Sequence, residues 1–115
     1  MRTVPCELTA DGLRICRSKP CDLDKLAVRY ADMVAAGART NDVAAWRASI
    51  RADGSWADID YASKIRATWP TANHLHRLTA LAAAGRATGD RETLAAAHAA
   101  LGYWRRKRFG NPNWW

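Results

Sequence analysis

Hydrophobic side chains recur at spacings of three and four residues in four segments, which is the period of an α-helix that faces a core. The first segment begins at Asp22 and ends before Gly37. Its apolar positions are Leu23, Leu26, Ala27, Tyr30 and Val34. The second segment follows Asn41, the expected N-cap. Its apolar positions are Val43, Trp46 and Ile50. We therefore expect two helices before a turn at Asp53-Gly54.

Two longer helical patterns follow Pro70. Gly85 and Gly89 mark the expected end of the third segment. Its apolar face consists of Ala72, Leu75, Leu78 and Ala82. The fourth segment begins at the expected N-cap Asp90, and Gly110 is placed to leave the helix after a run of four cations. Its expected buried stripe consists of Leu94, Ala97, His98, Leu101 and Trp104.

Two segments carry no clean period. Residues 1–21 contain Pro5, Gly12 and Pro20 and predict an irregular N-terminal arm. Residues 53–70, DGSWADIDYASKIRATWP, mix aromatic, acidic and turn-forming side chains. A long irregular connection in a small helical protein is often functional. The expected fold is all-α, with about four helices and one long irregular loop, and its main domain covers residues 22–115.

Composition and charge limit the classes of function. The 115 residues suffice for one domain, and no stretch approaches the roughly 20 apolar residues of a membrane span. No export signal is visible at the start of the chain. The net charge is +7, and residues 61–115 carry all of it, with nine basic and two acidic side chains. Such an excess favours an acidic partner: nucleic acid, anionic lipid or an acidic polysaccharide.

The metal-ligating residue types do not form a recognisable site. Cys6, Cys16 and Cys21 have no histidine near them in the sequence, whereas zinc sites need four ligands at paired short spacing. A disulfide between two of the three, in an exported parent, is the better explanation of these cysteines. His74 and His76 point to different faces of a helix. We therefore expect no metal and no cofactor.

Acidic and basic side chains suggest chemistry only weakly. Asp58 and Asp60, with Asp53 nearby, could hold a divalent cation or act on a glycoside, but turn and capping roles are favoured. Tyr61 is expected to be packed, with its hydroxyl group hydrogen-bonded. The run at residues 105–108 points around a helix, so a solvated helix end is favoured over a nucleic-acid groove.

The chain contains six tryptophans. Trp56, Trp69 and Trp104 interleave with apolar positions, so we expect them to pack in the core. Trp114 and Trp115 instead follow Gly-Asn-Pro-Asn, a turn-forming run. Aromatic rings held on a loop bind sugars, because the apolar C–H face of the pyranose packs against the ring. The adjacent basic run suits a sugar that carries carboxylates or sulfates.

The stretches DGSWADIDYASKIRATWP and LGYWRRKRFGNPNWW, with a helix beginning TANHLHRL between them, resemble the N-terminal part of the family 8 polysaccharide lyases. That family includes hyaluronate, chondroitin AC and xanthan lyases. The resemblance covers about residues 22–115, and family members usually continue past the paired tryptophans into an acidic-Ile-Gly-x-Pro segment, which this chain does not contain.

The resemblance implies an incomplete α/α toroid and a β-elimination on uronic-acid-containing polysaccharides. Asn113, Trp114 and Trp115 match the family's substrate-binding aromatic patch. The family's catalytic Asn, His, Tyr and Arg lie downstream of the paired tryptophans, so no catalytic residue is assigned in this chain. Tyr61, Tyr103, His74 and His76 are not expected to replace them.

We therefore expect this chain to be an N-terminal fragment of a secreted lyase, inactive by itself, with an apolar patch left exposed. The parent enzyme is expected to be a monomer in the extracellular space or the periplasm. Its expected partner is an acidic polysaccharide such as hyaluronan, chondroitin or xanthan, and not nucleic acid or a membrane. The alternatives are a basic helical module that binds nucleic acid and a helical scaffold whose tryptophan-rich face meets a protein.

Overall fold

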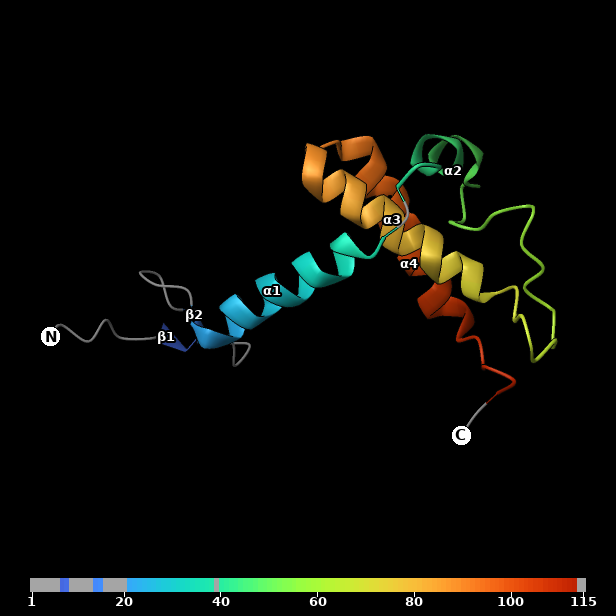
Figure 1. The fold of residues 1–115 in the computed structure, drawn as a ribbon, viewed down its shortest axis with the longest axis horizontal. Helices are drawn as coiled ribbons and strands as arrows, with labels where there is room; N and C mark the ends of the chain where they lie inside the picture. The colour runs from blue at the N-terminus through green and yellow to red at the C-terminus, as the bar shows by residue number, and fades with distance from the viewer. Residues whose placement is uncertain (1–6, 9–13, 16–20, 39, 114–115) are drawn as a thin grey trace, which may run out of the picture. The chain divides into compact units, whose positions relative to one another are not determined.

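The fold is all-α, as the sequence predicts. A computed structural model of the chain describes residues 7–8, 14–15, 21–38 and 40–113 (Figure 1). It divides into two compact units, Met1–Met33 and Val34–Trp115. The helices are α1 (Asp22–Ala36), α2 (Val43–Ser49), α3 (Ala72–Thr88) and α4 (Arg91–Lys107). None of the helices in the described ranges is long and apolar enough to cross a membrane.

The N-terminal unit contains a small hairpin and most of α1. The strands β1 (Glu7–Leu8) and β2 (Arg14–Ile15) pair antiparallel, with Glu7 opposite Ile15. Helix α1 spans the predicted residues, and its start is held by Asp24, whose carboxylate accepts a hydrogen bond from the backbone N–H of Cys21 at 3.1 Å. None of its residues is buried, and its large apolar side chains are exposed.

Helices α3 and α4 form an antiparallel pair that is the centre of the C-terminal unit (Figure 1). Gly89 ends α3 in the left-handed conformation (φ 70°), and its N–H donates to the carbonyl of Gly85 at 2.8 Å. Asp90 then caps α4 by accepting a hydrogen bond from the N–H of Glu92 at 3.0 Å. Both caps are as predicted. Gly85 does not end α3 but lies inside it, where a Cβ atom would come within 2.8 Å of the Leu94 side chain.

The predicted buried faces of both helices were wrong by a rotation about the helix axis. The residues of α4 that are buried are Thr93, Ala96, Ala97, Ala100 and Tyr103, so only Ala97 of the expected stripe is among them. His98 and Leu101 are exposed. The residues of α3 that are buried are His74, Ala80, Leu81 and Gly85. The small residues at this contact allow the two backbones to approach closely, which larger side chains would prevent.

Two helix ends also differ from the prediction. The N-cap of α2 is Asp42 rather than Asn41, and its side chain makes no capping hydrogen bond. The C-cap of α4 is Arg108, which has a φ of 49° and donates its N–H to the carbonyl of Trp104 at 3.1 Å. Arg108 rather than Gly110 therefore carries the left-handed conformation, at some cost for a residue with a Cβ atom.

The long connection (residues 50–71) between α2 and α3 is irregular, as predicted, but it belongs to the core. Its only ladder contact is an isolated bridge between Ile50 and Trp56. Gly54 adopts a φ of 91°, and a Cβ atom there would lie 2.0 Å from the carbonyl oxygen of Ala99. The backbone of the connection therefore lies directly on α4. The buried core cluster consists of Trp56, Ile59, Leu81, Ala96, Ala97 and Ala100.

Candidate functional site

Trp56, in the Asp-Gly-Ser-Trp stretch, joins the long connection to α2. Its side chain is completely buried, as expected for a core tryptophan. Its indole Nε1–H donates to the carbonyl oxygen of Trp46 at 2.9 Å, and its backbone N–H donates to the hydroxyl oxygen of Tyr61 at 3.0 Å. Both N–H groups of Trp56 are therefore satisfied.

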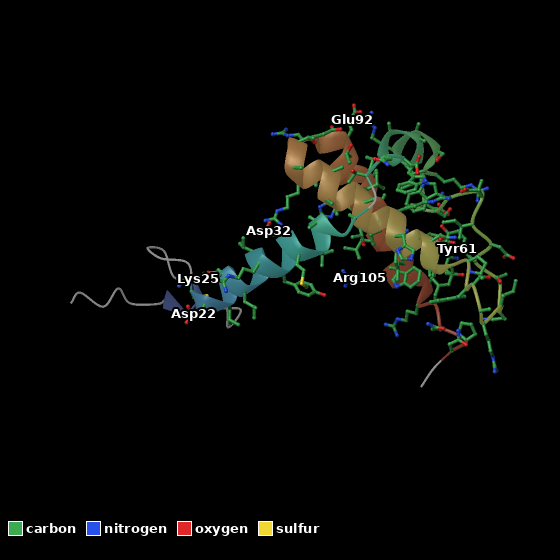
Figure 2. All side chains as sticks on the ribbon, in the orientation of Figure 1. Asp22, Lys25, Asp32, Tyr61, Glu92 and Arg105 are labelled. Carbon is green, nitrogen blue, oxygen red and sulfur yellow. The ribbon has the colours of Figure 1, made fainter. Side chains whose placement is uncertain are left out.

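Tyr61 and His74 extend this series of hydrogen bonds to α3 and α4. Figure 2 shows Tyr61 in the long connection, next to the start of α3. Its hydroxyl oxygen lies 2.9 Å from Nδ1 of His74, and Nε2 of His74 lies 2.8 Å from the carbonyl oxygen of Ala100. A carbonyl oxygen can only accept, so Nε2 carries the proton and Nδ1 accepts from the Tyr61 hydroxyl. Each group of the chain thus has one defined role.

The surroundings keep both ring systems neutral. Burial lowers the pKa of His74 below its ordinary value, and the nearby Arg77 guanidinium lowers it further, although the bond to Ala100 opposes both effects. Burial also raises the pKa of Tyr61. Because the hydroxyl of Tyr61 and both nitrogens of His74 are already engaged, this arrangement suits positioning rather than proton transfer to a substrate.

The expectation for Tyr61, packed with a hydrogen-bonded hydroxyl, is confirmed. The different faces expected for His74 and His76 are also confirmed, since His74 is buried and His76 is exposed. The central place of His74 was not predicted. The one signal in the sequence is that the inward face of α3 has a histidine, rather than an apolar residue, in its first turn.

Asp53 and Asp60 of the long connection have the predicted turn roles, whereas Asp58 instead forms an ion pair with α3. Asp58 receives two hydrogen bonds from the Arg77 guanidinium, at 2.8 and 2.6 Å, and these lower its pKa. Asp53 accepts from the N–H and hydroxyl of Ser55, at 2.9 and 2.6 Å. Asp60 accepts from the N–H of Ala62 at 3.0 Å. Within the described part of the chain, no three His, Cys, Asp or Glu residues form a group that could hold a metal ion.

Arg77 also stabilises the tryptophans beneath it. Its guanidinium carbon lies 5.6 Å from the ring centre of Trp46 and 5.3 Å from that of Trp56. The Arg77 side chain is only 13% exposed, whereas Asp58 is 65% exposed. The ion pair therefore reaches from the surface to the core, and it fixes the connection onto α3.

A partly exposed aromatic surface, formed by Trp69, Trp104 and Phe109, lies beside the buried chain. The ring centres of Trp69 and Trp104 are 6.1 Å apart in an edge-to-face arrangement, and those of Trp104 and Phe109 are 5.0 Å apart. Trp69 and Trp104 were expected in the core, but each is only half-buried. Solvent therefore reaches both of these indoles.

Aromatic contacts connect this surface to His74 and Tyr61. The His74 ring stacks on Trp104 with a centroid distance of 5.5 Å, and Phe109 stacks on Tyr61 at 5.4 Å. Tyr103 makes further ring contacts with His74 and Phe109, at 5.6 and 5.9 Å. The buried histidine therefore supports the aromatic surface from below.

The segment after α4 (residues 108–113) returns to the long connection. The side-chain Nδ2 of Asn113 donates to the backbone carbonyl of Arg66, and the N–H of Asn113 donates to Oδ1 of Asn111 at 2.8 Å. Asn113, one of the predicted substrate-binding residues, thus contacts the stretch DGSWADIDYASKIRATWP, which contains Arg66. Trp114 and Trp115 lie outside the described residues, and their assignment stays a prediction.

The basic run at the end of α4 is exposed along its whole length, as expected for a solvated helix end. Arg106 donates to the carbonyl of Asp53 at 2.9 Å, and Nζ of Lys107 lies 5.7 Å from the ring centre of Tyr103. The cations therefore spread around the helix, and some already serve contacts within the protein. Lys64 and Arg66 add exposed positive charge on the long connection.

Comparisons with protein-family models, curated proteins and solved structures gave no match to this chain.

Proposed function

We propose that this chain is part of a polysaccharide lyase that cleaves uronic-acid-containing polymers by β-elimination, and that it holds the polymer through its aromatic surface. One observation carries this proposal: the two stretches that resemble family 8 lyases meet in space. Asn113 hydrogen-bonds to Arg66, 47 positions earlier, and Phe109 stacks on Tyr61. Stretches so distant in sequence are expected to meet if they build one site.

The chemistry of this meeting place suits an acidic sugar. Half-buried indole rings, such as those of Trp69 and Trp104, offer flat apolar faces beside polar rims. Exposed cations lie close in sequence on both sides, with Arg66 before Trp69 and Arg105 after Trp104. Guanidinium groups bind carboxylates in pairs of hydrogen bonds. Trp114 and Trp115, which follow Asn113, are proposed to extend this binding surface.

The proposed role is binding and scaffolding, with no catalytic residue in this chain. β-Elimination needs a base for the proton at C5, neutralisation of the uronate, and a proton for the leaving oxygen. Tyr61 and His74 have the right residue types, but both are held in the buried hydrogen-bond chain. The groups that perform the reaction are proposed to belong to the rest of the lyase.

Calorimetric titration tests the binding. Oligosaccharides of hyaluronan and chondroitin should bind, more weakly at higher salt, and a neutral oligosaccharide of equal length should bind at least several-fold more weakly. Trp69→Ala should reduce the affinity, whereas Leu101→Ala, a control at an exposed position of α4, should not. Equal affinity for the neutral sugar, or no effect of Trp69→Ala, would contradict the proposal.

A second assay tests the absence of chemistry. The chain is incubated with hyaluronan, chondroitin or xanthan, and the absorbance of the unsaturated uronate product is followed. No turnover is expected. Turnover that Tyr61→Phe or His74→Gln abolishes would place the reaction in this chain and overturn the division of roles.

One observation favours a second candidate function, binding of nucleic acid: the four consecutive cations at residues 105–108 are all exposed. Single-stranded RNA should then bind with an affinity that falls steeply with salt and is indifferent to Trp69→Ala. We favour the sugar because the cations spread around the helix rather than along one stripe.

A further inference from the structure

We propose that His74 is a pH-sensitive latch, which holds the long connection and the aromatic surface against α3 and α4 when neutral and releases them when it takes up a proton. The effect on sugar binding rests on the proposed function. The latch itself concerns only residues within the C-terminal unit and can be tested without any sugar.

The latch is the chain of three hydrogen bonds from Trp56 through Tyr61 and His74 to Ala100. Their lengths are 3.0, 2.9 and 2.8 Å. Each bond joins a different pair of structural parts: the connection to itself, the connection to α3, and α3 to α4. His74 and Trp56 are both completely buried, so water cannot replace a lost partner without an opening of the structure.

A proton on Nδ1 conflicts with this arrangement. The neutral ring accepts from Tyr61 at Nδ1 and donates to Ala100 at Nε2, whereas the charged ring donates at both positions. The Tyr61 hydroxyl would then face the N–H groups of both Trp56 and His74, and its own hydrogen would need a new acceptor. The Tyr61 oxygen can accept from both N–H groups, so the cost of the added proton is a hydroxyl hydrogen that has lost its acceptor inside the fold.

Among the described residues no carboxylate faces His74 to offset the new charge, and only the carbonyl oxygen of Ala100 favours the charged ring. The groups that face it are Trp56 and Tyr61 from the connection, Arg77 from its own helix α3, and Tyr103 and Trp104 from α4. Arg77 is a cation, and a second cation, Lys107, lies over the ring of Tyr103. Asp58 is bound to Arg77, and neither hydrogen-bond partner of His74 is a carboxylate. Burial and Arg77 together favour the neutral ring.

Release would reach the aromatic surface directly. His74 stacks on Trp104, and Tyr61 stacks on Phe109, so movement of both rings removes support from two of the three residues of that surface. A polymer held on this surface should therefore be bound more weakly in mildly acidic solution. The fold of the α3–α4 pair, which also rests on Leu81, Ala96 and Ala97, should open later.

The test uses the ¹⁵N-labelled 115-residue chain and no ligand. At pH 7.5, the ring nitrogen shifts of His74 should report the Nε2–H form. Between pH 7.5 and 5.5, the hydrogen-exchange protection factor of the Trp56 amide should fall about tenfold. In the open state the imidazole has its ordinary pKa of about 6.5, so the proton that it takes up stabilises that state. Protection of the Ala97 amide should fall less.

Variants separate the latch from general acid weakening. His74→Gln keeps one acceptor and one donor without a titrating group, so the pH dependence of Trp56 protection should disappear. His98→Gln, a control on the exposed side of α4, should behave as the unchanged protein. Should His74→Gln fail to fold, Tyr61→Phe supplies the test, since loss of the acceptor should lower Trp56 protection already at pH 7.5.

An Nδ1–H form of His74 at pH 7.5, or a Trp56 protection factor that changes less than twofold, would overturn the latch. An undiminished pH response in His74→Gln would do the same. These readouts involve no sugar, so they remain valid if the titrations with oligosaccharides fail. Conversely, a chain that binds uronate equally at both pH values, with an intact latch, contradicts only the coupling between them.

Discussion

The hydroxyl oxygen of Tyr61 lies 2.9 Å from Nδ1 of His74, and this contact joins an irregular connection to the helix pair beneath it. The same hydroxyl accepts the N–H of Trp56, so a single side chain organises the Asp-Gly-Ser-Trp stretch. His74 completes the chain at the carbonyl of Ala100. The irregular segment owes its defined conformation to these buried bonds rather than to regular secondary structure.

The stability of the fold should fall on mild acidification because of His74. Its pKa in the folded protein is lowered by burial, so the unfolded chain takes up a proton first as the pH falls. The contribution is complete well above the unfolded pKa of about 6.5 and is lost as the pH falls below it towards the folded pKa. Urea unfolding should give a smaller free energy of unfolding at pH 5.5 than at pH 7.5, and His74→Gln should remove most of this difference.

Carboxylates should affect the stability of the fold in a separate and more acidic pH range. The pKa of Asp58 is lowered by hydrogen bonds from Arg77, and that of Asp53 by hydrogen bonds from Ser55. Groups of this kind stabilise the fold above their unfolded pKa, and the stabilisation is lost as the pH falls through the folded value. Asp58→Asn should therefore flatten the unfolding profile below about pH 5, and leave the step near pH 6.5 in place.

Gly54→Ala should be severely destabilising. A Cβ atom at this position would lie 2.0 Å from the Ala99 carbonyl oxygen, and the φ of 91° is strained for any other residue. We expect a loss of more than about 3 kcal/mol in the free energy of unfolding, measured in urea. Gly89→Ala is the matched control, since its φ is 70° but a Cβ atom meets nothing within 4 Å. It should cost only about 1 kcal/mol; equal losses would contradict this account.

Arg77→Lys should also destabilise the protein, although the charge is kept. A lysine cannot make both hydrogen bonds to Asp58 or lie flat against Trp46 and Trp56. The expected loss is about 1–3 kcal/mol in urea unfolding. Arg91→Lys, at an exposed position of α4, should change stability by less than about 0.5 kcal/mol.

Asn113→Ala should separate binding from stability. Asn113 lies near the surface and contributes one hydrogen bond to the Arg66 carbonyl, so the free energy of unfolding should fall by about 1 kcal/mol or less. Under the proposed function, affinity for a hyaluronan oligosaccharide should drop several-fold, because the segment after α4 loses its attachment. Unchanged affinity would show that this attachment does not shape the binding surface.

Local features of the fold could be predicted from the sequence. The ends of α1, the cap at Asp90 and the left-handed Gly89 depend on neighbouring residues, and each was confirmed. The all-α class and the irregular character of the long connection were also confirmed. Capping and turn geometry involve few residues, so short sequence patterns carry the necessary information.

The buried faces of α3 and α4 could not be predicted in the same way. The contact is made by small residues and by Gly54, which approaches α4 from 45 positions earlier, near Ala99. Leu75 and Leu101 give a convincing apolar period in the sequence, yet both are exposed. His74 was overlooked because a buried histidine is stabilised only by partners, Tyr61 and Ala100, that the fold brings together.

The most direct test of the proposed binding surface is an NMR titration of the indole N–H signals with a hyaluronan oligosaccharide. The signals of Trp69 and Trp104 should shift in proportion to saturation, whereas that of Trp56, which is completely buried and bonded to Trp46, should stay in place. If a saturating oligosaccharide leaves Trp69 and Trp104 unmoved, or if a neutral oligosaccharide shifts them equally, the proposed surface for acidic sugars is wrong.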